Sequence, residues 1–447
     1  MPASATPAQC RAAHQRGDDW GVTLAPRSGM ARGVNAPQPI AAKAGPPLGF
    51  AEFVALVAAL MALTALGIDS MLPALPAIGD ALGVAAPNER QFVIVAFLLG
   101  FGIGQLVHGP LADRLGRRPV LIAALALYVL ANLIAAAAWS FPALLAARFA
   151  GGAAIAASRV VTVALVRDCY SGRAMARVMS LAFMVFMAAP VLAPSFGQLI
   201  LLFGNWRLIF LMIGAVTAVV LLWFAWRMPE TSRPETRLPL SIARLAAGWR
   251  HTITDRWSLG YTLAAAALLG ALYGFINSVQ QIVAALTGSD RLLVPVFIGV
   301  AGIMAVANLL NSRIVMRLGT RRISHAALIA LVCLSAVHLA LATAGAETIW
   351  SFAILQALAM GCFGLATANF SSMAMENMGP IAGTASSVQG FVTVTIGSVV
   401  GAAIGQGFDG TTVPLYRGFL ITGIVALAIV LIVERGRLFA PQHPSSR

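Results

Sequence analysis

Long apolar runs separated by short polar segments dominate the chain. A transmembrane helix needs about 20 mostly apolar residues. Twelve runs meet that length, at 50–71, 91–110, 119–139, 142–166, 178–202, 207–226, 259–286, 293–316, 325–345, 349–372, 381–405 and 415–434. They lack the period-2 alternation of outer-membrane strands, so they favour helices over a β-barrel. The pattern predicts an all-α membrane protein with twelve transmembrane helices.

The composition supports a lipid environment. Hydrophobic residues make up 59% of the chain and charged residues only 10%, against about 25% charged in ordinary soluble domains. Too few polar side chains are available to cover a water-soluble surface, and a single soluble core of this size would exceed the usual limit. Lipid must therefore contact most of the outer surface.

The net charge of +14 raises the possibility of a nucleic-acid partner. If the N-terminus is cytoplasmic, 24 of the 30 Lys and Arg residues lie in inner tails and loops, four in outer loops and two in the fourth helix. This asymmetry follows the positive-inside rule and predicts that both termini are cytoplasmic. No soluble basic domain is predicted, so we expect no nucleic-acid binding.

The longest polar interruption divides the predicted helices six and six. The sequence Arg114–Arg118 recurs about 200 residues later as Arg317–Arg322, after the second helix of its half. Such duplication is typical of transporters whose two bundles rock around a central site. The predicted divisions are a disordered cytoplasmic tail at 1–48, bundles at 49–226 and 259–434, a cytoplasmic linker at 227–258 and a cytoplasmic tail at 435–447. Residues 1–48 lack the apolar region of a signal peptide, and an alternative is that translation starts at Met30.

A specific motif occupies residues 109–120, which read GPLADRLGRRPV. Gly109 and Gly116 are expected to permit tight turns in an inner loop, and Asp113 places an anion at that face. The loop's arginines anchor it to the membrane surface; these are Arg114, Arg117 and Arg118.

This segment resembles the first signature motif of the major facilitator superfamily. From about residue 50 to 434 the chain resembles its 12-helix drug:proton antiporters of the Bcr/CflA type. The resemblance implies two six-helix bundles, with Asp113 near the N-terminus of the eleventh helix when the inner side is closed. Such a contact is worth about 0.3–2 kcal/mol and would bias a conformational switch. A simple topological anchor is the alternative.

Two arginines lie inside the fourth predicted helix. Arg148 falls where the resemblance places the Arg of the family's second motif, and Arg159 lies eleven residues later on nearly the same helix face. A charge in hydrocarbon is costly, so each should face the bundle interior and have a partner. The alternative partners are neighbouring backbone carbonyls.

Asp69 is the only acidic residue well inside any predicted span. If the first helix continues, Pro73 places a kink at Asp69; if Pro73 ends the helix, Asp69 lies at the outer interface. Burial favours the protonated carboxyl and Arg148 favours the ionised form. Asp69 and Arg148 are therefore the predicted proton-coupling pair.

The fifth predicted helix contains two prolines four residues apart. Residues 189–197, APVLAPSFG, resemble the antiporter motif of exporters, with a compliant bend at Pro190, Pro194 and Gly197. A kink without directional meaning is the alternative. Glycines at four-residue spacing let helix backbones approach closely; they are Gly100, Gly104, Gly397, Gly401 and Gly405. The resemblance implies that the second and eleventh helices, which carry them, face each other across the two halves.

Several polar residues are candidates to line a substrate cavity, although interhelical hydrogen bonding is a common alternative use of such side chains. The candidates are Gln105, Tyr273, Asn277, Gln281 and Asn369, followed by Gln280 and Asn308. His108 and His338 titrate in a useful range but rank below Asp69, because neither is expected near the cavity.

No enzyme signature is present. The four cysteines are widely spaced, and metal-protease and P-loop motifs are absent, so we expect no enzyme, metal site or cofactor. The leading hypothesis is a proton-coupled exporter of amphipathic drugs, similar to phenicol and bicyclomycin exporters. We expect a monomer in the bacterial inner membrane, with a small-molecule substrate, protons and the lipid bilayer as its partners. The alternatives are a metabolite exporter or importer, and a non-transporting sensor or scaffold.

Overall fold

The structure is a computed structural model that describes residues 48–170, 172–232 and 242–439. Within the sixth helix, the side chains of residues 172, 173, 176, 180 and 183–191 are also outside the described set. The predicted tail at 1–48, except for Leu48, and the last eight residues of the predicted tail at 435–447 therefore lie outside the described residues.

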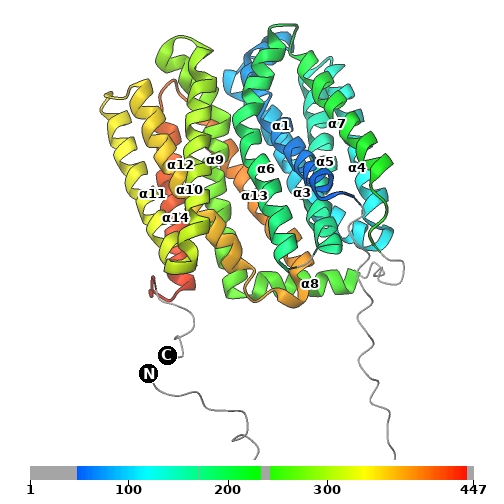
Figure 1. The fold of residues 1–447 in the computed structure, drawn as a ribbon. Coiled ribbons are helices and arrows are strands. Elements are labelled where there is room, and N and C mark those ends of the chain that lie inside the picture. The colour runs from blue at the N-terminus through cyan, green and yellow to red at the C-terminus, as the bar shows by residue number, and fades with distance from the viewer. Residues whose placement is uncertain (1–47, 171, 233–241, 440–447) are drawn as a thin grey trace, which may run out of the picture. The chain divides into compact units, whose positions relative to one another are not determined.

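The described residues fold almost entirely into helices (Figure 1). The first half contains α1 (Phe50–Asp69), α2 (Leu75–Ala81), α3 (Phe92–Leu115), α4 (Arg117–Ala136), α5 (Phe141–Cys169), α6 (Gly172–Leu201) and α7 (Arg207–Arg227), with short 3₁₀ helices η1 (Leu72–Ala74) and η2 (Pro87–Gln91). The second half contains α9 (Arg256–Thr287), η4 (Asp290–Leu292), α10 (Leu293–Leu318), α11 (Thr320–Thr343), α12 (Ile349–Ala374), η5 (Gly379–Ile381), α13 (Ala382–Gln406) and α14 (Val413–Val433). Between the halves, α8 (Ile242–Thr254) lies in the predicted linker.

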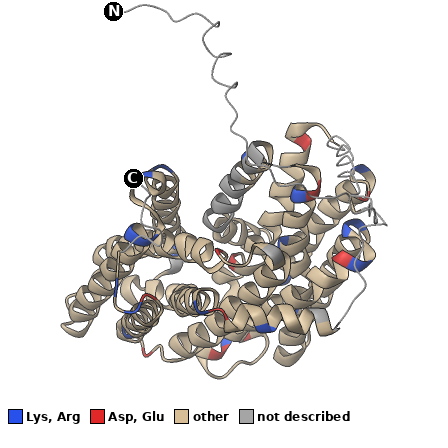
Figure 2. Ribbon diagram, turned by 90° about the horizontal axis from the view of Figure 1, so that it is seen from below, with Lys and Arg blue, Asp and Glu red and all other residues tan. Residues whose placement is uncertain are grey.

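Eleven helices of the described chain are long and apolar enough to cross a membrane. The helix α6 occupies the position of the remaining predicted span. The all-α prediction with twelve spanning helices in two bundles is therefore confirmed. Most of the ribbon is neither acidic nor basic in the view from below (Figure 2), as expected where lipid surrounds the protein.

The two bundles meet along two pairs of helices, α3 with α13 and α6 with α10. The helix α8 packs against α13 and α9 at one end of the bundle (Figure 1). We call this end the α8 face and the other end, where η2 lies, the η2 face. These two faces organise the polar contacts described below.

The signature motif does not form the loop predicted for it. The helix α3 continues through Gly109 and Pro110 to Leu115, and only Gly116 separates it from α4. Gly116 has a positive φ of 104°, which supports the predicted tight turn there. Gly109 is inside the helix, where a Cβ atom would meet the Ser387 hydroxyl at 2.9 Å. The prediction of a turn at Gly109 is therefore wrong. The absence of a side chain at Gly109 instead allows α3 to pack closely against α13.

Four of the five glycines at four-residue spacing have a different use from the predicted one, and only Gly405 among them meets the other bundle, at the Gln91 side chain. A side chain at Gly100 or Gly104 would overlap backbone carbonyls of α5, and one at Gly397 or Gly401 would contact α9. Each glycine pair thus packs helices of one bundle together. The interface between α3 and α13 uses other small positions, including Gly102 against Thr395.

Ion pairs at the α8 face repeat the internal duplication. In the first half Arg117 pairs with Asp113 at 2.5 Å and Asp168 at 3.2 Å. In the second half Arg321 pairs with Glu434 at 2.8 Å and Glu376 at 3.8 Å. Each arginine follows the positive-φ glycine that begins a new helix. The predicted duplication therefore extends from the basic motif to its acidic partners.

Candidate functional site

Asp69 is buried at the last residue of α1, with only 4% of its surface exposed. Its Oδ1 atom has no hydrogen-bond partner, and no ion pair to a described residue involves Asp69. The helix α1 ends at Asp69, which agrees with the prediction that Pro73 ends the helix rather than kinking it. The short helices η1 and α2 continue the span. The end is nevertheless buried rather than at the interface, so Asp69 is an isolated carboxyl inside the protein.

Arg148 does not pair with Asp69. Its Nε donates to the Val93 carbonyl at 3.1 Å and its Nη2 to the Gly67 carbonyl at 2.8 Å, while its guanidinium lies 4.3 Å from the Phe97 ring centroid. These contacts tie α5 to α1 and α3, as the backbone-carbonyl alternative proposed. Arg148 thus binds the backbone two residues before Asp69 without forming an ion pair with its carboxyl group.

Arg159 differs from Arg148 in its surroundings. Although both belong to α5, Arg148 is buried and Arg159 is exposed. Tyr273 on α9 lies within electrostatic range of both Arg159 and Asp69. We call Asp69, Arg159 and Tyr273 the central site. It brings together α1 and α5 of the first bundle with α9 of the second.

The other predicted cavity residues divide by environment. Gln105 is buried against Gly390 of α13, and Asn369 donates to Asn311 at 2.9 Å and to the Leu365 carbonyl at 2.8 Å. Asn369 thus links α12 to α10, as the alternative interpretation of such residues proposed, whereas the buried Nε2 atom of Gln105 has no hydrogen-bond partner. Asn277, Gln280 and Gln281 instead line a cavity near the η2 face.

Amide side chains join the two bundles at the η2 face. Gln91 donates to the Gln281 side chain at 2.7 Å and to the Gly405 carbonyl at 3.1 Å. Gln281 donates to Asn88 at 3.0 Å, and Asn88 exchanges hydrogen bonds with Gln406. We call Asn88, Gln91, Gln281 and Gln406 the amide lock. All hydrogen bonds between described residues of the two bundles are in this region.

The predicted conformational-switch residues cluster at the α8 face. Asp113 pairs with Arg117 of its own motif rather than with the start of α13. The backbone N–H groups of Arg117 and Arg118 both donate to the Glu230 carboxylate, at 3.0 and 3.1 Å. Glu230 therefore caps the N-terminus of α4, where an anion is favoured. Arg114 is in the last turn of α3.

The proline-containing helix α6 runs from Gly172 to Leu201 through both prolines. Pro194 and Gly197 are buried, and a side chain at Gly197 would overlap the Ser70 carbonyl oxygen next to Asp69. The side chain of Pro190 lies outside the described residues. Gly197 thus allows α6 to approach the end of α1.

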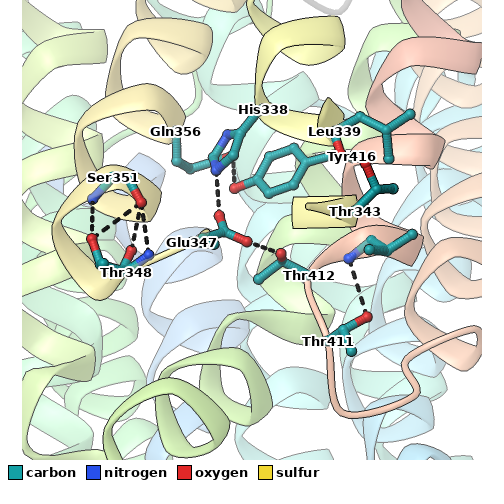
Figure 3. Close-up of polar contacts among 11 residues, drawn as sticks. His338, Leu339, Thr343, Glu347, Thr348, Ser351, Gln356, Thr411, Thr412 and Tyr416 are labelled. Carbon is teal, nitrogen blue, oxygen red and sulfur yellow. Dashed lines mark hydrogen bonds and ion pairs between the residues drawn. The ribbon is translucent and has the colours of Figure 1, made fainter. Parts of the chain in front are cut away.

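A second buried polar cluster lies where α11 ends and where α12 and α14 begin (Figure 3). His338 contacts Glu347 at 2.5 Å, Glu347 accepts from the Thr412 hydroxyl, and the Tyr416 ring stacks on His338. The Tyr416 hydroxyl also donates to Gln356 of α12, so the cluster ties α11, α12 and α14 together, away from the central site. His338 therefore belongs to this cluster and not to the central site, where it was not expected.

Three comparisons with known proteins agree with this architecture. Residues 57–405 match the family model described as Major Facilitator Superfamily. A Haemophilus influenzae bicyclomycin resistance protein homolog is 30% identical over 81% of this chain and 91% of its own length. The multidrug resistance protein MdtL of Klebsiella pneumoniae is 29% identical over 85% of this chain and 95% of its own. A chloramphenicol resistance protein of Pseudomonas aeruginosa is 35% identical over 51% of this chain and 53% of its own.

A solved structure shares the fold. The human organic anion transporter MFSD10 (TETRAN) superposes with a TM-score of 0.64 at 18% identity, over 86% of this chain and 100% of its own. The family and these relatives are transporters and not enzymes. With the helical architecture, the match over residues 57–405 shows that the chain is a multi-pass membrane transporter that belongs to the major facilitator superfamily.

Proposed function

We propose that this chain exports small amphipathic molecules, antibiotics among them, from the bacterial cytoplasm in exchange for protons. The observation that carries the proposal is the buried, unpaired carboxyl of Asp69 within the central site. An ionised carboxylate without a partner is costly to bury, whereas the neutral acid is far less so. Asp69 can therefore gain or lose a proton in response to what else occupies the site.

The central site also supports competition between proton and substrate. Arg159 is a permanent cation exposed in the same region, and Tyr273 of the other bundle lies within electrostatic range of both Arg159 and Asp69. When Asp69 is protonated the local positive charge is unbalanced, which favours a neutral or weakly anionic ligand. Because Arg148 is fixed by carbonyls, it acts in this proposal as a positioning residue for the end of α1.

The asymmetry between the two faces supports alternating access. The amide lock closes the η2 face, and no hydrogen bond between described residues joins the bundles at the α8 face. We assign the α8 face to the cytoplasm, because the basic motifs lie there and cytoplasmic loops are rich in Lys and Arg. In this assignment both termini are cytoplasmic and the structure faces inward.

Two relatives named for bicyclomycin and chloramphenicol resistance support drug export as the direction. The test is to express the chain in an efflux-deficient bacterium and measure susceptibility to a broad compound panel. We expect the wild-type chain to reduce susceptibility to neutral antibiotics, including chloramphenicol. We expect Asp69→Asn to leave susceptibility as it is without the transporter. Unchanged susceptibility across the panel, with the protein present in the membrane, would favour a metabolite carrier or a non-transporting sensor.

A further inference from the structure

A cavity of about 390 Å³ lies between the bundles on the η2 side of the central site. This volume is within the range of small-molecule sites, about 300–1,000 Å³. Its apolar walls are formed by Leu75, Pro76, Pro87, Ala284 and Phe408. Its polar residues are Arg90, Gln91, Asn277, Gln280 and Gln281, from η2 and α9. Apolar walls with a small number of convergent polar groups are the usual composition of a ligand site.

Asn277 is the polar residue that points to a ligand. It is only 1% exposed, it lines the cavity, and neither its Nδ2 nor its Oδ1 atom has a hydrogen-bond partner. Buried amides are normally hydrogen-bonded, and leaving one unsatisfied costs about 1–3 kcal/mol. A carboxamide presents one donor and one acceptor side by side. A ligand with a matching acceptor and donor on one edge would satisfy both.

The remaining polar atoms define the charge of that ligand. Arg90 is the one charged residue among the described residues that line the cavity, and its Nη2 already binds the Asp80 carboxylate at 2.8 Å. Its Nε is buried without a partner, as is the Oε1 atom of Gln91. These described lining residues therefore offer further hydrogen bonds but no free anion for an amine. A neutral ligand fits this balance, and a dication does not.

We propose that this cavity is a second binding site, used on the release route, for compact neutral amides. A cis amide places its N–H and C=O on the same edge, so both bond to Asn277 at once, as two carboxamides pair. The inference rests on the proposed function for its place on an export route. The binding itself does not depend on export. Opening the amide lock would free Gln91 and Gln281, which line the same cavity, and let the ligand leave.

Protection of a cysteine tests the site on the purified full chain in detergent. The reporter is Ala284→Cys, a partly buried wall position, after replacement of Cys10, Cys169, Cys333 and Cys362. The probe is the cyclic dipeptide cyclo(Leu-Gly), which carries two cis amides. Its N,N′-dimethyl derivative is the matched control ligand, because it lacks the N–H donors. The rate of maleimide labelling is measured against ligand concentration.

We expect cyclo(Leu-Gly) to slow labelling, and Asn277→Leu to raise its half-protecting concentration about tenfold or more, as expected for two lost hydrogen bonds. The dimethyl derivative should be similarly weak when Asn277 is intact, and should lose nothing further in Asn277→Leu. The control Asn132→Leu removes a buried asparagine of α4 that bonds within its own helix, and should leave protection unchanged.

Three results would overturn the proposal. If neither cyclo(Leu-Gly) nor its dimethyl derivative slows labelling, the cavity holds water only. Equal protection with and without the Asn277→Leu substitution, together with loss in Asp69→Asn, would place the ligand in the central site. Equal loss in Asn277→Leu and Asn132→Leu would show a general effect of removing buried asparagines. Because no transport is measured, a failure of the export proposal leaves this result readable.

Discussion

Gln91→Leu is predicted to open the η2 face. The substitution keeps the side chain's approximate size but removes the two hydrogen bonds from Gln91 to Gln281 and to the Gly405 carbonyl, at 2.7 and 3.1 Å. Each such bond contributes about 0.5–1.5 kcal/mol net. Their joint loss of about 1–3 kcal/mol shifts the conformational equilibrium about 5- to 150-fold toward the state that is open at this face.

The shift can be measured by double electron–electron resonance between spin labels on either side of the lock. Ala86→Cys and Thr411→Cys are suitable positions, because both residues are exposed and they flank the locked segments. We expect a longer-distance population to grow in Gln91→Leu. The control is Gln389→Leu, which also removes two hydrogen bonds, to Ser258 and to the Ala374 carbonyl, both within the second bundle.

An unchanged distance distribution in Gln91→Leu would refute the view that the amide lock holds this face closed. The same shift in Gln389→Leu would show that the effect is a general loosening of the protein. Either result would leave the closed η2 face to be explained by packing between α3 and α13.

Further predictions concern switching, substrate charge and stability. Asp113→Asn removes an ion pair to Arg117 at the α8 face and should change the rate of alternation without changing substrate affinity, as measured by cysteine accessibility and equilibrium binding. Matched neutral and dicationic compounds should differ in uptake, with the neutral series favoured; Arg159→Gln should reduce that difference, because charge repulsion at 4 Å is about 4 kcal/mol at an effective dielectric of 20. Glu434→Gln leaves Arg321 without its buried carboxylate partner and should lower the free energy of unfolding by up to about 3–5 kcal/mol. A thermal-shift assay should show this loss as a lower Tm.

The spanning helices were predictable because length and continuous apolarity alone determine them. The duplication was predictable from the repeated basic motif, and the structure adds acidic partners that the sequence analysis missed. Asp168 and Glu376, like Glu230 and Glu434, recur about 200 residues apart at corresponding helix ends. That spacing was a usable signal, although single acids near helix ends are common.

The partner of Arg148 was not predictable, because it depends on where α1 ends. Ending at Asp69 leaves the Gly67 carbonyl among those without a helical donor, and Arg148 binds it. Pro73 allowed either a kink or an end, so the sequence left this open. The amide lock was missed for another reason. Its members lie far apart in the chain, and isolated amides give no signal of their pairing.

Proton-driven transport by inverted membrane vesicles tests the central claim most directly. Vesicles containing the wild-type chain or Asp69→Asn are given an imposed proton gradient, and accumulation of radiolabelled chloramphenicol is followed. We predict uphill accumulation by the wild-type chain, and none by Asp69→Asn, which should still exchange labelled for unlabelled substrate without a gradient. Gradient-driven accumulation by Asp69→Asn at the wild-type rate would contradict the assignment of Asp69 as the proton site.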